Sequence, residues 1–453
     1  MIWWKKALES LMSAKEGAGL DIFKAFPATR RFLAARHHYA QLRTAGDVLF
    51  VVVVISGLFG PQEAQNNFAV FLTWGIIWPV IVLSWFFVGR MWCGICPFPG
   101  LGVFLQSKGL TLNLPVPKFL KDYGVYCSVF LLALIIWVES TAGLNYSPAG
   151  TSYLIMAIVG GAAIMAILFP GQSWCRHLCP LGRMTGAAAT MSITEFRADH
   201  RKCKGCKTFA CKRGREGRAG CPVYLGAFSV QNNLHCLVCG HCLPFCDRDA
   251  PQLLLRNPYN ELIKNQGRFI TCTYIVPFLM GSQLARFFRE NKPLYDSLLS
   301  TLHISDALLF SICLVVCSLA VLWVINMGAN YFGIKKDPIC GRLSPMVPLL
   351  IPLAFIGELV YRFTFFAHGV GDFIPTIGRQ FSLPLLERLA FAIPSLPVQI
   401  LSGFFLLNAT LASAYILWRF SVVEFSEYIT LRSFVMLNIL VGSLLVTYLL
   451  VIF

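Results

Sequence analysis

Charged side chains are scarce in this chain, and acidic ones especially so. Asp, Glu, Lys and Arg make up 13% of the 453 residues, with 22 acidic against 38 basic residues. Hydrophobic residues make up 56%, and the mean hydropathy is +0.65. Because soluble domains carry about 25% charged residues, this composition excludes an ordinary soluble protein and predicts one embedded in a bilayer.

Several functional motifs are also missing. No Cys-x-x-Cys-His occurs, so covalently attached c-type haem is not expected. No GxGxxG or Walker loop stands in a useful context, so nucleotide binding has no support. The basic segments lack an aromatic stacking platform, so no nucleic-acid partner is expected, and the net charge of +16 needs another explanation.

Long apolar runs predict an all-α polytopic protein with about nine transmembrane helices. A run must cross a hydrocarbon core of about 30 Å, and the first and fifth runs are short enough to be re-entrant or interfacial instead. The runs lie near 45–60, 67–89, 123–142, 152–170, 269–285, 305–328, 344–366, 397–418 and 433–453.

The basic residues are divided unevenly between alternate loops, which explains the net charge. With nine spans and the N-terminus inside, 32 of the 38 Lys and Arg residues fall on the inner side. By the positive-inside rule, the N-terminus and all the cysteine motifs face the cytoplasm and the C-terminus lies outside. We therefore expect a multi-pass protein of the cytoplasmic (inner) membrane.

The spacing of these runs predicts four parts. Residues 1–44 mix aromatic and basic residues as interfacial helices do, and residues 45–190 form a four-helix membrane unit. Residues 191–267 form a polar loop far longer than a normal helix connection, and residues 268–453 form a five-helix membrane unit. We expect the long loop to be a small α+β ferredoxin-like insert on the cytoplasmic side.

Eight cysteines fill this insert in two groups. The second group has the spacing C-x2-C-x2-C-x3-C, by which a peptide holds three corners of one [4Fe-4S] cluster and lends its fourth thiolate to a neighbour. That crossed scheme assigns one cluster to Cys203, Cys206, Cys211 and Cys246. It assigns the other to Cys221, Cys236, Cys239 and Cys242.

Two four-cysteine zinc sites are the alternative for this insert, although zinc sites favour paired C-x2-C knuckles. Disulfides are a minor alternative in a reducing compartment. The basic residues around the first group would raise a cluster's reduction potential and attract an acidic partner protein, or they serve only as the positive-inside signal. These are Lys202, Lys204, Lys207, Lys212, Arg213, Arg215 and Arg218.

Two Cys-Pro motifs end the second and fourth predicted spans. The first contains Cys93-Gly94-Ile95-Cys96-Pro97, and the second contains Cys175-Arg176-His177-Leu178-Cys179-Pro180. Paired motifs of this kind before a two-cluster loop resemble the membrane polyferredoxin family. That family includes the nitrous oxide reductase regulator, the quinol-oxidising subunit of periplasmic nitrate reductase, and the cupric reductase of cytochrome oxidase maturation.

The resemblance covers about residues 45–270 and implies electron transfer at a quinone-containing membrane. The first motif departs from the family pattern, with two residues between its cysteines where three are usual. Cys93, Cys96, Cys175 and Cys179 could form a third metal site, either copper(I) or iron-sulfur, or a redox dithiol pair, or helix caps. The chain also lacks the regulator's flavin-binding domain and the maturation protein's immunoglobulin-like tail.

The predicted membrane units contain further ionisable residues, histidines and single cysteines. Ionisable residues at membrane depth suggest a proton path or a quinone site, for which the candidates are Glu358, Arg362, His368 and Asp372, although Glu358 and Arg362 could simply pair. His303 with His368 gives only weak support for a haem b, which we do not expect. The cysteines expected to be small apolar side chains are Cys127, Cys272, Cys313, Cys317 and Cys340.

The sequence thus favours a membrane electron-transfer protein, an electron-transfer subunit of a quinol-dependent oxidoreductase. Two [4Fe-4S] clusters would pass electrons between the quinone pool and a redox partner or other subunits of a respiratory complex. A copper-reducing maturation factor for a respiratory metalloenzyme is the alternative. A transporter with regulatory clusters is a third hypothesis, which rests on the span count alone.

Overall fold

Helices that could cross a membrane dominate the structure. The computed structural model describes residues 2–13, 19–215, 219–264, 272–330, 343–424 and 429–452. Eight helical segments in that part of the chain are long and apolar enough to span a bilayer. They are Ala40–Phe59, Phe68–Val88, Lys118–Thr141, Pro148–Leu168, Asp306–Ala329, Ser344–Phe381, Ser395–Val422 and Leu431–Ile452. This confirms a helical, multi-pass membrane protein.

The fifth predicted run, 269–285, is the one that does not appear among these spans. Its described part falls on helix α15, Ile275–Glu290, which has 16 residues and therefore rises about 24 Å. That length is short of a hydrocarbon core of about 30 Å. The helix also carries Gln283, Arg286 and Arg289, which lower its hydropathy. A count of nine spans therefore stays a prediction.

The chain forms two compact units. Unit 1 comprises Met1–Val54, Leu83–Ser128 and Tyr153–Glu261, and unit 2 comprises Ile55–Val82, Val129–Ser152 and Leu262–Phe453. The first four spanning segments are therefore each divided between the two units.

Unit 1 contains short helices around the cysteine motifs, together with one small sheet. Its helices include α1 (Ile2–Met12), α2 (Ile22–Ala25), α3 (Pro27–Ala34), α7 (Met91–Ile95), α8 (Gly100–Ser107), α11 (Pro180–Ala189), α12 (His200–Cys203) and α13 (Ala210–Arg213). Helix α14 (Asn260–Lys264) begins in unit 1 and ends in unit 2. Parts of α4 (Arg36–Phe59), α6 (Trp78–Val88), α9 (Lys118–Thr141) and α10 (Pro148–Leu168) also belong to it.

The sheet closes the base of the insert. Strand β1, Thr194–Ala198, pairs antiparallel with β2, Pro251–Leu255, so the two ends of the cysteine segment are held together. A buried ionic network supports this closure. Arg256 lies 2.5 Å from Glu261, which also accepts hydrogen bonds from Arg197 at 3.1 Å and from the backbone N–H of Asn233 at 2.9 Å. Because Arg256 and Glu261 are buried, these contacts fix the insert firmly.

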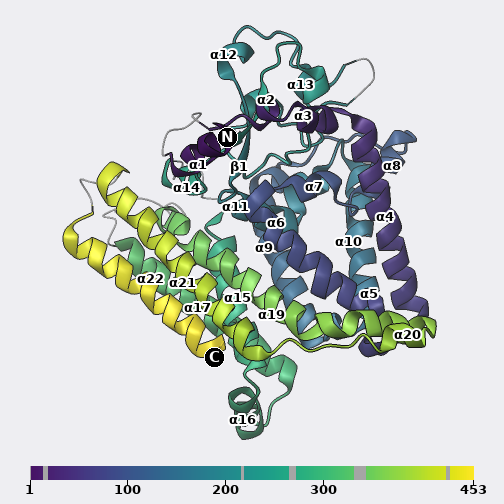
Figure 1. The fold of residues 1–453 in the computed structure, drawn as a ribbon, viewed down its shortest axis with the longest axis vertical. Coiled ribbons are helices and arrows are strands. Elements are labelled where there is room, and N and C mark those ends of the chain that lie inside the picture. Colours follow the sequence, from purple (N-terminus) through teal and green to yellow (C-terminus); the bar gives the residue numbers. More distant parts are fainter. Residues whose placement is uncertain are drawn as a thin grey trace. The chain divides into compact units, whose positions relative to one another are not determined.

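The N-terminal segment packs onto the insert. Phe23 and Leu33 are buried in the same apolar core as Leu237 and Leu253. The backbone N–H of Leu255 donates to the carbonyl of Leu20, extending the sheet edge. In Figure 1, α2 and α3 lie beside the insert helices of the same unit. The basic N-terminal residues are therefore tied to the cysteine segment by apolar packing.

In unit 2, helices pack around α15. This helix contacts α17 (Asp306–Ala329), α19 (Val347–Phe381) and α22 (Leu431–Ile452), and α21 (Ser395–Arg419) packs on α19 and α22 (Figure 1). Helix α19 has 35 residues with Pro352 and Pro375 inside, and its rise of about 52 Å exceeds a membrane core. Unit 2 also holds α16 (Lys292–Leu302), α20 (Pro384–Glu387), α5 (Phe68–Phe71) and the π-helical turns Leu72–Ile77 and Phe420–Glu424.

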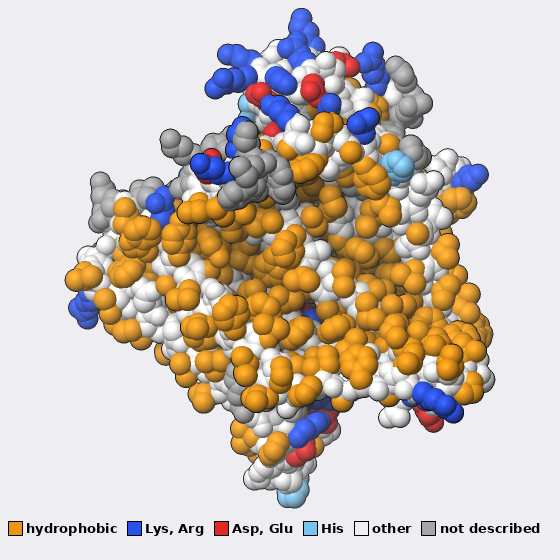
Figure 2. All heavy atoms as spheres, viewed as in Figure 1, with side chains coloured by type: hydrophobic (Ala, Val, Ile, Leu, Met, Phe, Trp, Pro, Cys, Tyr) orange, Lys and Arg blue, Asp and Glu red, His pale blue; other side chains and the backbone are white. Residues whose placement is uncertain are grey.

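The surface separates by side-chain type. Figure 2 shows Lys and Arg gathered over the insert, whereas hydrophobic side chains cover the spanning helices. Many of these hydrophobic side chains are more than half exposed, including Phe130, Trp323 and Phe404. Apolar faces of this extent require lipid around them.

Candidate iron-sulfur and thiol sites

The eight insert cysteines line two cavities, four in each. Cys203, Cys206, Cys211 and Cys246 line a cavity of about 390 Å³. Lys202, Lys207 and Arg248 stand on its wall, and Phe209 and Phe228 meet edge to face beside it. We call this the basic cavity; it draws three thiols from the first cysteine group and one from the second.

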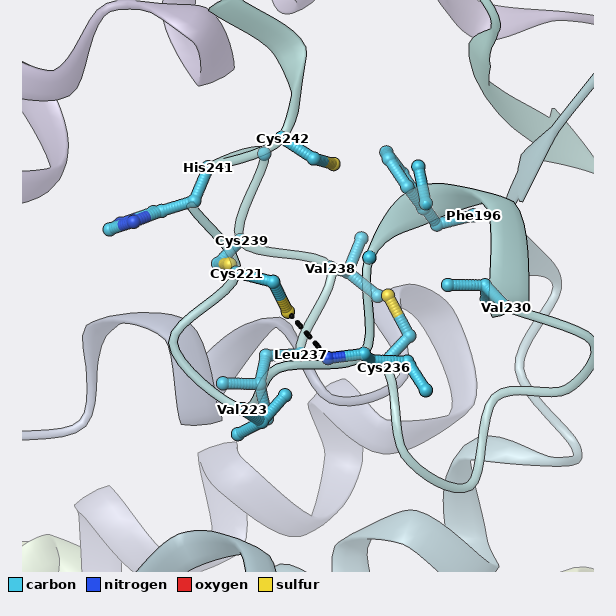
Figure 3. A pocket seen from close by; sticks show the side chains of 14 residues that line it. Phe196, Cys221, Val223, Val230, Cys236, Leu237, Val238, Cys239, His241 and Cys242 are labelled. Atoms are coloured by element: carbon cyan, nitrogen blue, oxygen red, sulfur yellow. Dashed lines mark hydrogen bonds between the residues drawn. The ribbon is translucent and has the colours of Figure 1, made fainter. Parts of the chain in front are cut away.

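The remaining four thiols line a narrower, apolar cavity. Figure 3 shows Cys221, Cys236, Cys239 and Cys242 around it, with Phe196, Val223, Val230 and Leu237 completing the wall. Only about 20 Å³ is open inside, and Cys239 and Cys242 are 9% and 8% exposed. We call this the apolar cavity; it takes one thiol from the first group and three from the second.

Tight turns bring these thiols together. Gly205 and Gly240 adopt positive φ angles of 81° and 68°, which glycine tolerates without strain. The turns also aim backbone N–H groups at sulfur: Leu225 donates to the Sγ of Cys221 and Ala250 donates to the Sγ of Cys246, each at 3.4 Å. Hydrogen bonds of this kind stabilise the negative charge of a thiolate or of a cluster.

The basic cavity holds one thiol whose pKa is lowered, Cys206, although burial raises the pKa of Cys203 and Cys211 in the same cavity. The backbone N–H of Phe209 and the hydroxyl of Thr208 lower the pKa of Cys206, whose thiol is close to water. Burial raises the pKa of Cys236 to about 11 and that of Cys239 to about 12. The exposed Cys206 and the basic side chains on the wall therefore favour a negative cluster more in the basic cavity than in the apolar one.

The two Cys-Pro motifs meet within unit 1. Cys96 is close enough to Cys93, Cys175 and Cys179 for their charges to raise its pKa, although loss of contact with water is the larger cause. Burial likewise raises the pKa of Cys179 to about 11 and that of Cys175 above its ordinary value. We call these four residues the Cys-Pro quartet.

A π-helical turn accounts for the different spacing of the two motifs. Cys93 lies within the α-helix α7, and Cys96 ends that helix. Cys175 lies in the π-helical turn Trp174–Leu178, where the N–H of Cys179 bonds to the carbonyl of Trp174 at 2.9 Å. Because a π turn holds one more residue than an α turn, three intervening residues here take the place of two in the first motif.

Arg90 lies between the Cys-Pro quartet and the apolar cavity. It is 5% exposed and donates to the backbone carbonyl of Leu234 at 2.6 Å, just before Cys236. Its charge lowers the pKa of Cys175, Cys179 and Cys236 against the larger effect of burial. Gly182 and Gly186 make room for the guanidinium, since a Cβ at Gly182 would lie 3.1 Å from it. The sequence alone provides no reason to assign this arginine a role.

A single metal ion has no ready-made site. Among the residues that the structure describes, no three His, Cys, Asp or Glu side chains gather closely enough to hold one ion. The thiols instead stand around cavities. Four thiols around a cavity suit a polynuclear cluster, in which each iron takes its own thiolate.

The other cysteines lie apart from these sets. Cys272 is buried, and Cys127 is partly buried on α9. Cys313 and Cys317 lie one turn apart on α17, packed against the buried Ala285 and Phe310. Cys340 falls outside the described residues.

The four polar candidates from the C-terminal part do not form one site. Glu358 and Arg362 are buried and bonded to each other at 2.9 Å. Asp372 pairs with Arg379 and bonds to Thr376. His368 is exposed and lines a separate cavity. His303 ends α16 and is exposed as well.

Glu358 and Arg362 belong to a longer buried chain of charges that the sequence did not reveal. Arg286 donates to Glu358 at 2.6 Å, and Arg362 donates to Glu139 at 2.8 Å. All four residues are less than 5% exposed. Two arginines and two glutamates therefore compensate one another, and their partners come from helices far apart in sequence.

Comparison with known proteins gives matches to the part containing the Cys-Pro motifs. A family described as a 4Fe-4S binding domain matches residues 70–112 and 151–191, which include the whole Cys-Pro quartet. An uncharacterized protein of Methanocaldococcus jannaschii is 27% identical over 176 residues, covering 38% of this chain and 66% of that protein. No solved structure matches.

Two ferredoxin-type proteins named NapH are also similar. The protein of Haemophilus influenzae is 24% identical over 186 residues, covering 37% of this chain and 63% of the relative. That of Escherichia coli is 30% identical over 175 residues, covering 35% and 58%. The chain thus spans less than two thirds of the length of these relatives.

These findings define the class as iron-sulfur proteins built on membrane-spanning helices. Within that class, the comparisons confirm the predicted resemblance to the membrane polyferredoxin family, through the 4Fe-4S domain and the similarity to ferredoxin-type NapH.

Proposed function

We propose that this protein transfers electrons between the membrane quinone pool and a redox partner through two [4Fe-4S] clusters in the insert. The observation that carries this proposal is the distribution of eight cysteines between two cavities, four in each. Each cavity takes its fourth thiol from the other cysteine group, as neighbouring clusters with exchanged ligands require. The 4Fe-4S family match and the NapH relatives support it.

In this proposal, a bound [4Fe-4S] cluster supplies one-electron chemistry, and the residues of each cavity set its potential. Apolar walls disfavour added negative charge, so the apolar cavity holds the centre of lower potential. N–H donors and nearby lysines favour added charge in the basic cavity. An electron therefore moves downhill from the apolar cavity to the basic cavity.

The outer end of this path suits an acidic partner protein. Lys202, Lys207 and Arg248 line the basic cavity, and Lys204, Lys212 and Arg213 stand nearby in the chain. Opposite charge on a partner would speed their encounter and orient it toward the cluster. The cytoplasmic location of this face follows from the positive-inside rule.

The Cys-Pro quartet is proposed as a third metal or redox site, most simply an iron-sulfur centre. The 4Fe-4S family match falls on these two segments, and four thiols share one place in unit 1. Arg90 lies between this quartet and Cys236, and its charge lowers the pKa of Cys175 in the quartet and of Cys236 in the apolar cavity. The quartet would then be the first centre in unit 1 to receive an electron.

The quinone part of the proposal rests on the family resemblance and on the polar residues of unit 2. Of the four polar residues that the sequence suggested for a quinone site, His368 lines a cavity, whereas Glu358 and Arg362 form buried ion pairs. Replacement of His368 or Asp372 by Ala should slow cluster reduction by quinol. Unchanged reduction in both variants would remove unit 2 as the quinone site.

Paired substitutions test the assignment of ligands. Cys221→Ser and Cys239→Ser should remove the same cluster, with a loss of about four iron atoms per chain, while Cys203→Ser and Cys246→Ser remove the other. Iron analysis and electron paramagnetic resonance of the anaerobically purified, full-length protein measure this. Cys127→Ser is the matched control and should change neither quantity. Iron-free wild-type protein would refute the proposal.

Copper reduction for the maturation of a respiratory enzyme is the second candidate. The quartet supplies soft thiol donors, but among the described residues no three of them lie close enough together to hold one ion, so copper binding would require them to move. This candidate predicts copper in the purified protein that a Cys93→Ser, Cys175→Ser double variant loses. Iron in the quartet, seen as a third paramagnetic centre that the same variant abolishes, would decide for the electron-transfer function instead.

A further inference from the structure

A second kind of cavity lies in unit 2, where four helices end or begin beside a fifth. The end of α15, the start of α16, the middle of α19, the start of α21 and the end of α22 enclose about 390 Å³. We call it the helix-end cavity. Its polar wall includes Glu290, Lys292, His368, Gln399 and Ser402. Of these side chains, the electron-transfer proposal uses only His368, as a quinone candidate, and the other four have no role in it.

The polar wall has unused hydrogen-bonding capacity. Ser402 is 1% exposed, and its hydroxyl has no hydrogen-bond partner among the described residues. A buried hydroxyl without a partner is costly, which points to a polar group in the cavity. Within the same part of the chain, no ion pair involves Glu290 or Lys292, although Tyr361 donates a hydrogen bond to Glu290. The wall therefore offers one anion and one cation to a ligand.

The other wall is apolar and continues onto a lipid-facing surface. Phe287, Val398 and Val451 line the cavity. On the adjoining turns, Leu396 and Ile400 are 63% and 64% exposed, and Leu450 is 73% exposed. Side chains this apolar and this exposed at helix ends face acyl chains in a bilayer. A ligand of the cavity thus has a charged head group and an apolar tail beside it.

We propose that the helix-end cavity binds a zwitterionic phospholipid whose head group carries a primary ammonium and a phosphate. The ammonium has three donors for the carboxylate of Glu290, the amide oxygen of Gln399 and the hydroxyl of Ser402. The phosphate oxygens accept hydrogen bonds from Lys292 and His368. A quaternary ammonium is disfavoured because such groups need an aromatic cage, and Phe287 is the one aromatic side chain on this wall.

Lipid retention by the full-length protein tests the proposal. The purified protein is stripped of lipid with detergent, mixed with vesicles of phosphatidylethanolamine, phosphatidylcholine or phosphatidylglycerol, and examined by native mass spectrometry. Phosphatidylethanolamine should be retained about tenfold over phosphatidylcholine, as expected for one charge-assisted hydrogen-bond set. Soluble glycerophosphoethanolamine should bind far more weakly, because it lacks the tail.

Matched variants separate the roles of the two charges. Glu290→Gln and Ser402→Ala should abolish the preference for the primary ammonium, and Lys292→Gln should weaken retention of phosphatidylethanolamine and phosphatidylglycerol alike. Glu387→Gln and Arg388→Gln, which change exposed charges on and beside α20, are the controls and should have no effect. Equal retention of all three lipids, no effect of Glu290→Gln, or displacement of the lipid by quinol would overturn the proposal. The readout needs no cluster, so it is independent of the electron-transfer function.

Discussion

At the scale of single residues, Arg90 stands out because one buried cation serves two sets of thiols. A positive charge beside a cluster favours the reduced state, and at an effective dielectric constant near 20 the effect on each neighbouring centre is roughly 1–2 kcal/mol. Arg90→Gln should therefore lower the potentials of the centres held by the Cys-Pro quartet and by Cys236 by about 50–100 mV. Redox titration followed by electron paramagnetic resonance measures the shift.

Arg90→Lys is the matched variant for this prediction. Lysine keeps the positive charge but lacks the planar guanidinium that donates to the carbonyl of Leu234. The reduction potentials should therefore shift by less than in Arg90→Gln. The centre in the basic cavity, further from Arg90, should keep its potential in both variants. Equal shifts at every centre would show that Arg90 acts by holding the fold together.

The acidities of the thiols predict an order of reaction in the metal-free protein. Thiolate is the reactive form, so Cys206, which is near water and has a lowered pKa, should be alkylated first near pH 7. Cys96, Cys175 and Cys239 should react last, because their raised pKa values keep them protonated until well above neutral pH. Mass spectrometry of peptides after timed treatment with iodoacetamide gives the order, and early labelling of Cys175 would contradict it.

The spacing of the cysteines predicted two sets of four ligands, and the same two sets line the two cavities, while their role as cluster ligands stays a prediction. The spacing rule carries this information because short loops leave few ways to place three thiols around one cluster. Arg90, Ser402 and Glu139 could not be recognised in the same way. The partners of Arg90 and Glu139 lie more than a hundred residues away in the sequence. Ser402 is recognised only by its burial without a hydrogen-bond partner among the described residues, so no local pattern records any of these features.

At the scale of elements, the buried charges between α9, α15 and α19 form a chain in which each member depends on the next. Arg362→Met would leave Glu139 buried and without its cation, which costs about 3–5 kcal/mol. We expect a marked fall in the thermal unfolding temperature of the protein in detergent. Arg379→Met, which breaks a partly exposed pair with Asp372, should cost no more than about 1 kcal/mol. A similar fall in unfolding temperature in both variants would show that the buried charges contribute no more to stability than an exposed ion pair.

Helices were easier to predict than their ends and irregular turns. Eight apolar runs were confirmed because hydropathy over about 20 residues is a strong signal. The π-helical turn at Trp174–Leu178 was not predicted, because inserting one residue in a turn leaves composition unchanged. Helix α15 was predicted as a membrane span because of its apolar residues. Its short length and its arginines suit a helix packed at the centre of unit 2, and hydropathy does not record that packing.

At the scale of the whole molecule, α15 decides the topology. If this helix crosses the bilayer, the N-terminus and C-terminus lie on opposite sides; if it does not, both lie inside. We expect a reporter active only outside the cytoplasm to be active when fused after residue 453 and inactive when fused before residue 1. Activity of a cytoplasmic reporter at the C-terminus would instead make α15 re-entrant.

The exchange of thiols between the two cysteine groups has a consequence for how the protein is made. The basic cavity needs Cys246, and the apolar cavity needs residues up to Cys242, so neither is complete on a nascent chain that has yielded only the first group. Pairing of β1 with β2 comes later still, since β2 begins at Pro251. In the proposed function, iron delivery to the insert must therefore wait for nearly the entire insert to leave the ribosome, and a product truncated before Cys242 would receive neither of the two insert clusters.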